Sequence, residues 1–562
     1  MIVQLSKLFN NGTNWLEKKQ TSILSAALII TIANIASSLA GLLRERLLIA
    51  SFFDSSSSQQ AYEAFQVAFQ IPDMLFQLII LGAVSASFIP LFTDLKKKST
   101  EQAFRFTSSV MNVLLLIFLV SSVLIALFAY PLTEWRTGVA FTPEQLEITV
   151  TLTRLMLFAQ LFFAISNFLT GILQSYQHFI VPAIAPVLYN VGIILGVFLF
   201  KAPFGIYSAG IGVILGAFLH MAMQLPLTWK LGFRPRFVID FKGISFKKLF
   251  RMMPPRVMTI GVSELQNLGL AFFATTIGQL SFVIIRLGMR LMTIPIRLFG
   301  VPIGQASLPF LSQESTEKTK QRFSSLVVQS LHQISFFALP ASVLLLILRV
   351  PIVRLVFGTD NFPWQTTLLT GKAVAILAIS VVAQALAQLL IRAFYALKNT
   401  KTPFYITIAA SVVFFIASAI SIRYTSLGVL GLAWAILIAA FLELFLFIIA
   451  LHRRIHCFTK QTFWLPQMKM ILASFLMAVF LYLPFKILDE LVFDTTRTLE
   501  LVALTVSTTT IGMLVYVYFS LLLDVKELNY LAQIFSKFAR WKGLLASSKE
   551  MLVETSVEGN EV

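Results

Sequence analysis

Long hydrophobic runs alternate with short polar segments along the whole chain, and most runs end at charged residues or at Gly, Pro and Asn. A helix needs roughly 20 mostly apolar residues to cross a bilayer, and barrel strands would alternate in shorter segments. We therefore predict about 14 transmembrane helices. Their approximate cores are 22–50, 63–93, 107–130, 146–173, 180–200, 206–229, 257–280, 283–311, 326–348, 368–395, 404–422, 427–451, 468–487 and 499–522.

The composition indicates the same fold class. Of the 562 residues, 57% are hydrophobic and 12% are charged, and the mean hydropathy is +0.83. A soluble globular protein carries about 25% charged residues, so we expect an all-α polytopic membrane protein. Cys457 is the single cysteine, which excludes a disulfide scaffold. The first run exceeds the hydrophobic region of a signal peptide and precedes many further spans, so we expect it to be retained.

The net charge of +18, from 44 Lys+Arg and 26 Asp+Glu, is strongly basic. Roughly 30 of the basic residues lie at the termini or in every second loop, which is the pattern of the positive-inside rule. The charge therefore indicates topology and contact with membrane lipids, and we expect no nucleic-acid partner. An even number of spans with both termini in the cytoplasm fits this asymmetry.

A repeat divides the chain into two halves. Pro72 and the Leu75-Phe76 pair recur as Pro295 and Leu298-Phe299, and a second match joins the segments before Pro182 and Pro403 at nearly the same offset. The offset spans six helices, so the halves share an orientation, as in transporters with a site between two lobes. The predicted organisation is a cytoplasmic, interfacial N-terminal segment 1–21, an N-lobe 22–230, a basic linker 231–256, a C-lobe 257–452, two further helices in 453–523 and a cytoplasmic tail 524–562.

A polar stripe follows the second run. Its members, at alternating spacings of three and four, share one helical face: Glu63, Gln66, Gln70, Asp73 and Gln77. Such a face contacts protein or water rather than lipid, so it forms either a hydrogen-bonded seam between helices or the wall of a cavity. We favour the cavity wall, because two carboxylates belong to the stripe.

The first run carries Arg44 at the end of another polar face, with Glu45 and Arg46 beside it. Arg44 either pairs with an acid such as Glu63 or is left to bind an anion. An arginine inside the membrane is costly, so a functional role is the default hypothesis.

The eighth run carries Arg286, Arg290 and Arg297 on one face, interrupted by an expected kink at Pro295. Three guanidiniums on one face repel one another unless an anion or a water-filled cavity compensates them. Their planar forks suit a pyrophosphate. Placement in the headgroup layer is the alternative and fits Arg286 best. Glu264 on the seventh run is a candidate counter-ion for an arginine.

The sequence lacks the motifs of an enzyme. The five histidines have no metal-ligand spacing, and there is no Walker A motif, dinucleotide-binding turn or catalytic triad. We expect no enzymatic activity, metal or cofactor, and any transport would depend on an ion gradient, the membrane potential or a downstream reaction.

Several stretches together resemble the MurJ (MviN) family of lipid II flippases, in the multidrug/oligosaccharidyl-lipid/polysaccharide exporter superfamily. The stretches are Ser37 through Gly41 to Arg44-Glu45, Glu63-Ala64-Phe65, Ala68-Phe69, Pro72, Ala86 to Pro90, Pro182 to Asn190, Arg290 to Ser312, and Arg392 to Pro403. The resemblance extends from about residue 30 to about residue 525, across all the predicted spans.

The resemblance implies two six-helix lobes around a cationic cavity, with a groove for a polyprenyl tail on the last two helices. Arg44 and Arg290 match family arginines that contact the pyrophosphate, and Glu63 matches a family acid. Other family positions differ, with Ser38, Phe76 and Gln77 where arginines are common and Met289 in place of an acid. Helix 11 has no acid, so the sodium site of some members is not expected. We hypothesise that Arg286 and Arg297 replace the missing positive charge.

The expected function is transfer of lipid II, an undecaprenyl-pyrophosphate-linked precursor, from the inner to the outer leaflet of a bacterial cytoplasmic membrane by alternating access. The expected substrate-binding residues are Arg44, Arg290, Arg297, Glu63, Gln66, Gln70 and Gln77, and the gating or counter-ion residues are Glu45, Glu264 and Arg286. Cell-wall synthesis proteins are candidate partners. The alternatives are export of another lipid-linked glycan or a drug, and a non-transporting scaffold for cell-wall assembly.

Overall fold

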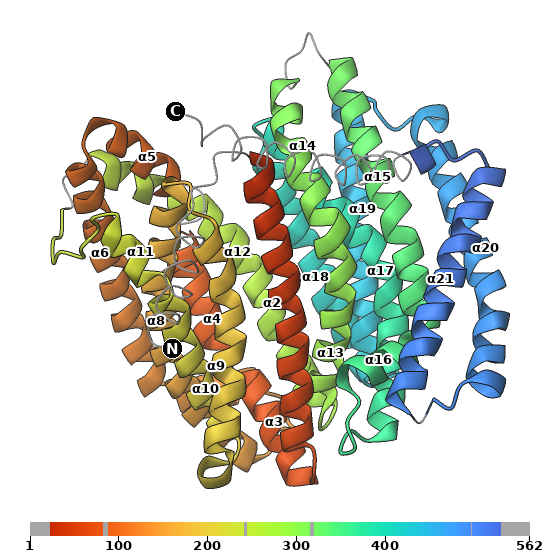
Figure 1. Cartoon of the computed structure of the whole chain (residues 1–562), viewed down its shortest axis with the longest axis horizontal. Coiled ribbons are helices and arrows are strands. Elements are labelled where there is room, and N and C mark those ends of the chain that lie inside the picture. The colour runs from red at the N-terminus through yellow and green to blue at the C-terminus, as the bar shows by residue number, and fades with distance from the viewer. Residues whose placement is uncertain (1–22, 83–87, 241–243, 315–319, 496, 530–562) are drawn as a thin grey trace, which may run out of the picture. The chain divides into compact units, whose positions relative to one another are not determined.

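A computed structural model describes residues 23–82, 88–240, 244–314, 320–495 and 497–529 (Figure 1). The regular elements of these residues are all helices, which confirms the all-α fold class. The helices are α2 (Ile23–Phe52), α3 (Ser56–Ala68), α4 (Gln70–Phe76), η1 (Gln77–Leu81), α5 (Ile89–Lys98), α6 (Thr100–Leu127), α7 (Ala129–Arg136), α8 (Pro143–Ser175), α9 (Ile180–Phe204), α10 (Tyr207–Ala222), α11 (Leu225–Lys230), α12 (Ile244–Ile277), α13 (Ser281–Pro295), η3 (Ile296–Gly300), α14 (Val301–Gln313), α15 (Lys320–Ile347), α16 (Arg349–Phe357), α17 (Trp364–Ala396), α18 (Lys401–Tyr424), α19 (Val429–Ile455), η5 (Lys460–Trp464), α20 (Leu465–Ile487), η6 (Leu488–Val492) and α21 (Thr498–Leu522).

The described residues contain 12 helical segments long and apolar enough to cross a membrane. Each coincides with a predicted hydrophobic run. The first and eighth predicted runs correspond to α2 and to the stretch from α13 through η3 to α14, which carry the arginines singled out above. The predicted interfacial segment 1–21 and most of the predicted tail lie outside the described residues.

The chain divides into two compact units. Unit 1 comprises Met1–Leu287, Val353–Ala373 and Ser411–Ala435, and unit 2 comprises Gly288–Ile352, Val374–Ala410 and Ile436–Val562. The division into an N-lobe and a C-lobe stays a prediction.

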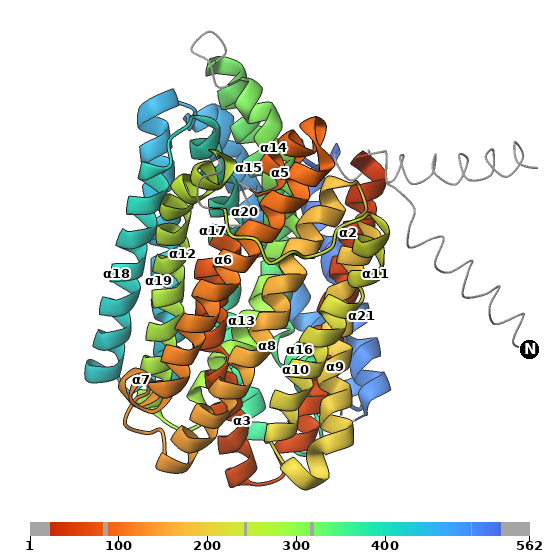
Figure 2. The same cartoon turned by 90° about the vertical axis from the view of Figure 1, so that its left-hand side faces the viewer.

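Unit 1 is built around the long helix α8, which packs against α3, α6 and α10 (Figure 2). A capping box fixes its start, because Thr142 accepts from the Gln145 amide and Gln145 accepts from the Thr142 amide. Phe88, Phe106 and Phe168 form an aromatic core between α5, α6 and α8. Leu75 of α4 packs into the same core and α3 packs against α8, so these contacts position the helices of the polar stripe.

Glycines bring α9 and α10 into close contact. A Cβ atom on Gly192 would lie 2.3 Å from the Cα of Gly216, and one on Gly196 would lie 2.2 Å from the Cα of Gly212. Small residues at such a seam allow two backbones in a membrane to approach closely. A larger residue at either position would force the helices apart.

A π-helical turn follows each of the two repeated prolines. In unit 1, α4 contains Pro72 and continues into η1. Pro72 has no N–H for the carbonyl of Ala68, and that oxygen accepts from Thr153 Oγ1 on α8 at 3.4 Å. In the second half, α13 ends at Pro295 and η3 follows, so the helix is interrupted where the kink was expected.

In unit 2, α15 packs against α20, and α20 and α21 lie side by side (Figure 1). The hydroxyl of Tyr516 donates to the carbonyl of Phe336 at 3.0 Å. Glu527, beyond the last span, pairs with His332 Nδ1 on α15 at 3.0 Å. Burial raises the pKa of the Glu527 carboxyl, but the hydrogen bond and charge of His332 outweigh burial and leave that pKa below its usual value. The segment after α21 is thereby held on α15.

Candidate functional site

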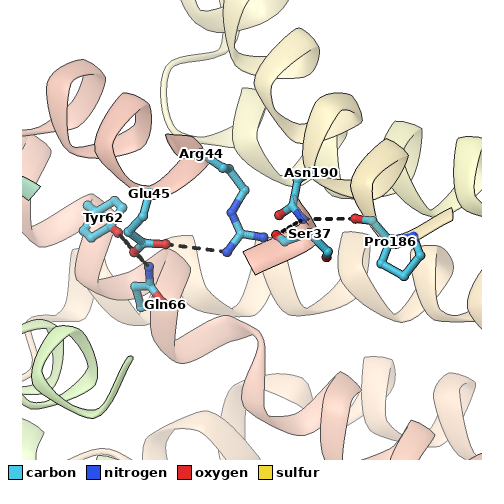
Figure 3. Close-up of polar contacts among 7 residues, drawn as sticks. All are labelled: Ser37, Arg44, Glu45, Tyr62, Gln66, Pro186 and Asn190. Carbon is cyan, nitrogen blue, oxygen red and sulfur yellow. Dashed lines mark hydrogen bonds and ion pairs between the residues drawn. The ribbon is translucent and has the colours of Figure 1, made fainter. Parts of the chain in front are cut away.

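A buried polar cluster surrounds Glu45 on α2 (Figure 3). Glu45 is fully buried and pairs with Arg44, with 3.6 Å between Oε2 and Nη2. The hydroxyl of Tyr62 on α3 donates to Glu45 Oε1. Gln66 Nε2, one turn further along α3, donates to the same oxygen at 2.7 Å and lies 2.7 Å from the Tyr62 hydroxyl. The hydrogen bonds from Tyr62 and Gln66 thus join α2 to α3, while the ion pair with Arg44 lies within α2.

The guanidinium of Arg44 lies between this cluster and α9 (Figure 3). Its side chain is 14% exposed, and its Nε has no hydrogen-bond acceptor among the residues that the structure describes. On the α9 side, Asn190 Nδ2 donates to the carbonyl of Ser37 at 3.4 Å and to that of Pro186 at 3.0 Å. Arg44 therefore has one ion pair and one unused donor within α2, the helix of the first predicted run.

The alternative in which Arg44 pairs with Glu63 is wrong, because each has a different partner. Glu63 is buried on α3 and accepts from the backbone amides of Leu280 at 3.0 Å and Phe282 at 3.2 Å. Gln145 Nε2 on α8 donates to Glu63 at 3.2 Å. Leu280 and Phe282 flank the start of α13, where backbone N–H groups lack partners within the helix. Glu63 therefore caps α13 from another helix and complements its dipole.

The next member of the stripe, Gln70, also binds protein groups. Its Nε2 donates to the carbonyl of Asn267 on α12 at 3.0 Å, and its Oε1 accepts from Arg136 at 2.8 Å. The first three members of the stripe therefore form a seam between helices, the alternative that we did not favour. Asp73 is exposed and accepts from Gln160 Nε2 at 3.1 Å, and Gln77 is half-buried. A substrate contact for Gln66, Gln70 or Gln77 stays a prediction.

Arg286 and two acids are electrostatic neighbours within unit 1. Arg286 is half-buried on α13 and interacts electrostatically with Asp73 on α4 and Glu264 on α12. Its guanidinium carbon lies 5.7 Å from the ring centre of Phe282. A counter-ion role for Glu264 toward Arg286 is compatible with this placement and stays a prediction.

Arg290 and Arg297 belong to unit 2. Arg290 is half-buried in α13, whereas Arg297 is exposed in the π-helical turn η3. Nearby in unit 2, Ser380 and Gln384 on α17 donate to the sulfur of Met292 at 3.2 and 3.3 Å. Arg297 therefore differs from Arg286 and Arg290 both in burial and in the kind of helix that carries it.

Sequence reasoning missed four residues that the structure brings into these networks: Tyr62, Arg136, Gln145 and Gln160. Gln160 had an available signal, as an amide inside a long apolar run. Arg136 falls in the loop between two predicted runs, where a basic residue indicates topology. Glu443 was also missed, although it is the only acid in the predicted core 427–451. Thr407 Oγ1 on α18 donates to Glu443 on α19 at 3.0 Å.

In the described part of the chain, no group of three or more His, Cys, Asp or Glu side chains could hold a metal ion. The polar groups of unit 1 instead form hydrogen bonds and ion pairs that link helices.

Comparisons with known proteins agree with this architecture. The family model described as lipid II flippase MurJ matches residues 49–499. The lipid II flippase MurJ of Burkholderia cenocepacia is 28% identical over 444 residues, covering 77% of this chain and 84% of that protein. A solved structure of lipid II flippase MurJ in an inward closed conformation superposes with a TM-score of 0.72 at 25% identity, over 88% of this chain and 98% of that one.

A more distant structure shares the fold. An inward-facing multidrug resistance transporter of the MATE family, in the MOP superfamily, has a TM-score of 0.62 at 18% identity, over 78% of this chain and 99% of its own. The family model covers most of the chain, including the Glu45 cluster on its α3 side, the Glu63 cap and the arginines of α13 and η3. The chain belongs to the lipid II flippase MurJ family.

Proposed function

We propose that this chain moves lipid II from the inner to the outer leaflet of the bacterial cytoplasmic membrane by alternating access. The observation that carries the proposal is Arg44, whose guanidinium, in the first predicted span, has a single 3.6 Å ion pair and an unused Nε donor. An arginine in a membrane-spanning helix costs free energy on insertion, up to about 2.5–3.5 kcal/mol at the helix centre. A pyrophosphate would compensate that cost and supply acceptors in pairs.

In this proposal, Arg44, Arg290 and Arg297 bind the diphosphate of the precursor. Glu45 holds Arg44 when substrate is absent, so the incoming phosphate competes with a carboxylate and not with water. The exchange needs little rearrangement of Glu45, because Tyr62 and Gln66 continue to hydrogen-bond its carboxylate.

The proposed gate lies where the second predicted helix meets the seventh and eighth. Glu63 binds amides at the start of α13, and Gln70 binds a carbonyl on α12. Opening of this gate would break the hydrogen bonds of Glu63 and Gln70, and closing would form them again. An ion gradient or the membrane potential would bias the two states, since one charge moved through 100 mV contributes about 2.3 kcal/mol.

The remaining parts of the proposal concern topology and the lipid tail. Both termini would lie in the cytoplasm, as the distribution of basic loops favours. The polyprenyl tail would lie along α20 and α21, whose outer faces expose large apolar side chains such as Leu483 and Leu514. Cell-wall synthesis proteins that consume the product would be the neighbours of the transporter.

The central test measures how much lipid II becomes accessible on the outer leaflet of cells depleted of their own flippase. We expect the wild-type chain to restore accessibility and Arg290→Ala to reduce it by about tenfold or more, because a charge-assisted contact to phosphate is lost. Arg154→Ala is the matched control, because Arg154 is exposed and donates to a backbone carbonyl, that of Ala126. If depletion and Arg290→Ala both leave externalisation unchanged, the proposal fails.

Arg297 tests whether an arginine on η3 replaces the positive charge missing at Ser38 and Phe76. We expect Arg297→Ala to abolish complementation of a flippase-depleted strain. Arg297→Lys should retain part of it, because lysine keeps the positive charge but cannot donate two parallel hydrogen bonds as a guanidinium does. Growth of Arg297→Ala at the wild-type rate, with equal protein in the membrane, would refute the compensation hypothesis.

A further inference from the structure

Arg136, the last residue of α7, is a deeply buried arginine that the proposed transport steps do not use. It is 4% exposed, and within the described residues it has no carboxylate partner and its Nε has no acceptor. Glu134, two residues earlier, is exposed. Burial lowers the pKa of the Arg136 guanidinium to about 9, so the group stays charged at neutral pH. A buried charge without an ion pair is costly and calls for a specific explanation.

The two terminal nitrogens of Arg136 donate hydrogen bonds to both sides of the junction between α3 and α4. Nη1 donates to Gln70 Oε1 at 2.8 Å, and Nη2 donates to the carbonyl of Val67 at 3.2 Å. Val67 is near the end of α3 and Gln70 is the first residue of α4, so one guanidinium contacts both sides of the break. A planar fork with two donors fixes the relative position of the two acceptors.

Residues 136–140, at the end of α7 and just after it, also bind α12. The amide of Gly138 donates to Thr275 Oγ1 at 2.7 Å, and the amide of Ala140 donates to the Thr275 carbonyl at 3.2 Å. A Cβ atom on Gly138 would lie 2.3 Å from the backbone nitrogen of Thr276, so the backbones are in direct contact. Gln70, oriented by Arg136, binds the carbonyl of Asn267 on the same helix. Residues 136–140 therefore bind α12 directly and also through Gln70.

We propose that Arg136 is a positioning residue that sets the angle between α3 and α4 and, through Gln70, holds α4 against α12 at Asn267. This inference rests on the proposed function in one respect, that separation of α4 from α12 is a step of the transport cycle. Arg136 does not touch the substrate. It controls how often the gate opens, since loss of its two bonds frees Gln70 and the Val67 carbonyl together.

Thiol labelling of the full chain in lipid nanodiscs tests the inference. In a Cys457→Ser background, one reporter is Ala271→Cys, on the face of α12 between Asn267 and Thr275 and fully buried. The other is Val257→Cys, at the opposite end of the candidate membrane span Val257–Ile277 of α12, where the Val257 side chain faces Gly82. The measurement is the rate of modification by a membrane-impermeant maleimide, with both faces of the nanodisc accessible.

We expect Arg136→Met to speed labelling at position 271 by about tenfold and to leave position 257 within about twofold of wild type. Arg136→Lys should give an intermediate rate at position 271, because an ammonium is a single point donor in place of a fork. Arg154→Met, at an exposed arginine of α8, is the control and should leave both rates unchanged. Gln70→Met should reproduce the effect, and combining it with Arg136→Met should add little.

Unchanged labelling at position 271 in Arg136→Met would overturn the inference. An equal rise at both positions would also overturn it, because that result indicates general loosening and not a change at one end. If Arg136→Met does not fold, Arg136→Lys and Gln70→Met carry the same comparison. Lipid II externalisation is measured separately, so a wild-type chain that fails to externalise lipid II would refute the proposed function without altering the labelling result.

Discussion

Glu45→Ala is expected to destabilise the protein more than any other single substitution in the described network. Glu45 is fully buried and accepts from Tyr62 and Gln66 while it pairs with Arg44. Its removal leaves a guanidinium, a hydroxyl and an amide without their acceptor inside a membrane protein. Breaking a buried pair by removing one partner costs about 3–5 kcal/mol, a large part of the free energy of unfolding of a typical domain. The measurement is thermal stability and yield of monodisperse protein in detergent.

Glu45→Gln is the matched comparison for this prediction. The glutamine oxygen still accepts from Tyr62, so the loss should be smaller and confined mainly to the ion pair with Arg44. Thermal stability of Glu45→Ala within error of wild type would contradict the buried-network interpretation. Equal losses in the two variants would show that the ion pair with Arg44 within α2, and not the hydrogen bonds to α3, carries the stabilisation.

Glu63→Ala is expected to release the start of α13 and to stop transport. The substitution removes the acceptor for two backbone amides and for Gln145, and loss of a helix cap alone costs about 0.5–2 kcal/mol. Hydrogen exchange measures the effect directly. The amides of Leu280 and Phe282 should exchange about tenfold faster or more, while amides in the middle of α8 stay protected.

An exposed acid in the same unit provides the control. Glu134→Ala removes a carboxylate from α7 and should change neither the exchange of the α13 amides nor lipid II externalisation. If Glu63→Ala leaves both unchanged, the cap has no role in the gate. If exchange rises but externalisation does not fall, the cap stabilises α13 without limiting the transport cycle.

The spans could be predicted from the sequence because their signal is local and large. A run of apolar residues long enough to cross a bilayer is sufficient to indicate a helix, and helices occupy all the predicted runs. Even α2 and α13, whose arginines interrupt the hydrophobic pattern, were found from the length of their runs. The proline at the end of α13 likewise marked the interruption, because proline cannot donate to the preceding turn.

The partners of the polar groups could not be predicted in the same way. Periodicity placed Glu63 on the correct helix face, but its acceptor role depends on the amides of Leu280 and Phe282, which are backbone groups with no sequence signature. The Arg44–Glu63 pair failed for the related reason that a neighbouring acid, Glu45, was already within reach. Arg136 was read as a topological charge, because burial of a loop arginine depends on tertiary packing alone.

The π-helical turns η1 and η3 have a mechanical consequence. A π turn contains one residue more than an α turn, and one residue of an α-helix corresponds to a rotation of about 100° and a rise of about 1.5 Å. Each turn therefore adds one residue directly after an α-helix, after α4 in the case of η1 and after α13 in the case of η3. If the π-helical turn shifts along the chain by one helical turn, the side chains that it passes rotate about the helix axis. The residues on either side of the shifted segment stay in place. Arg297, within η3, and Gln77, the first residue of η1, are side chains that such a movement would turn.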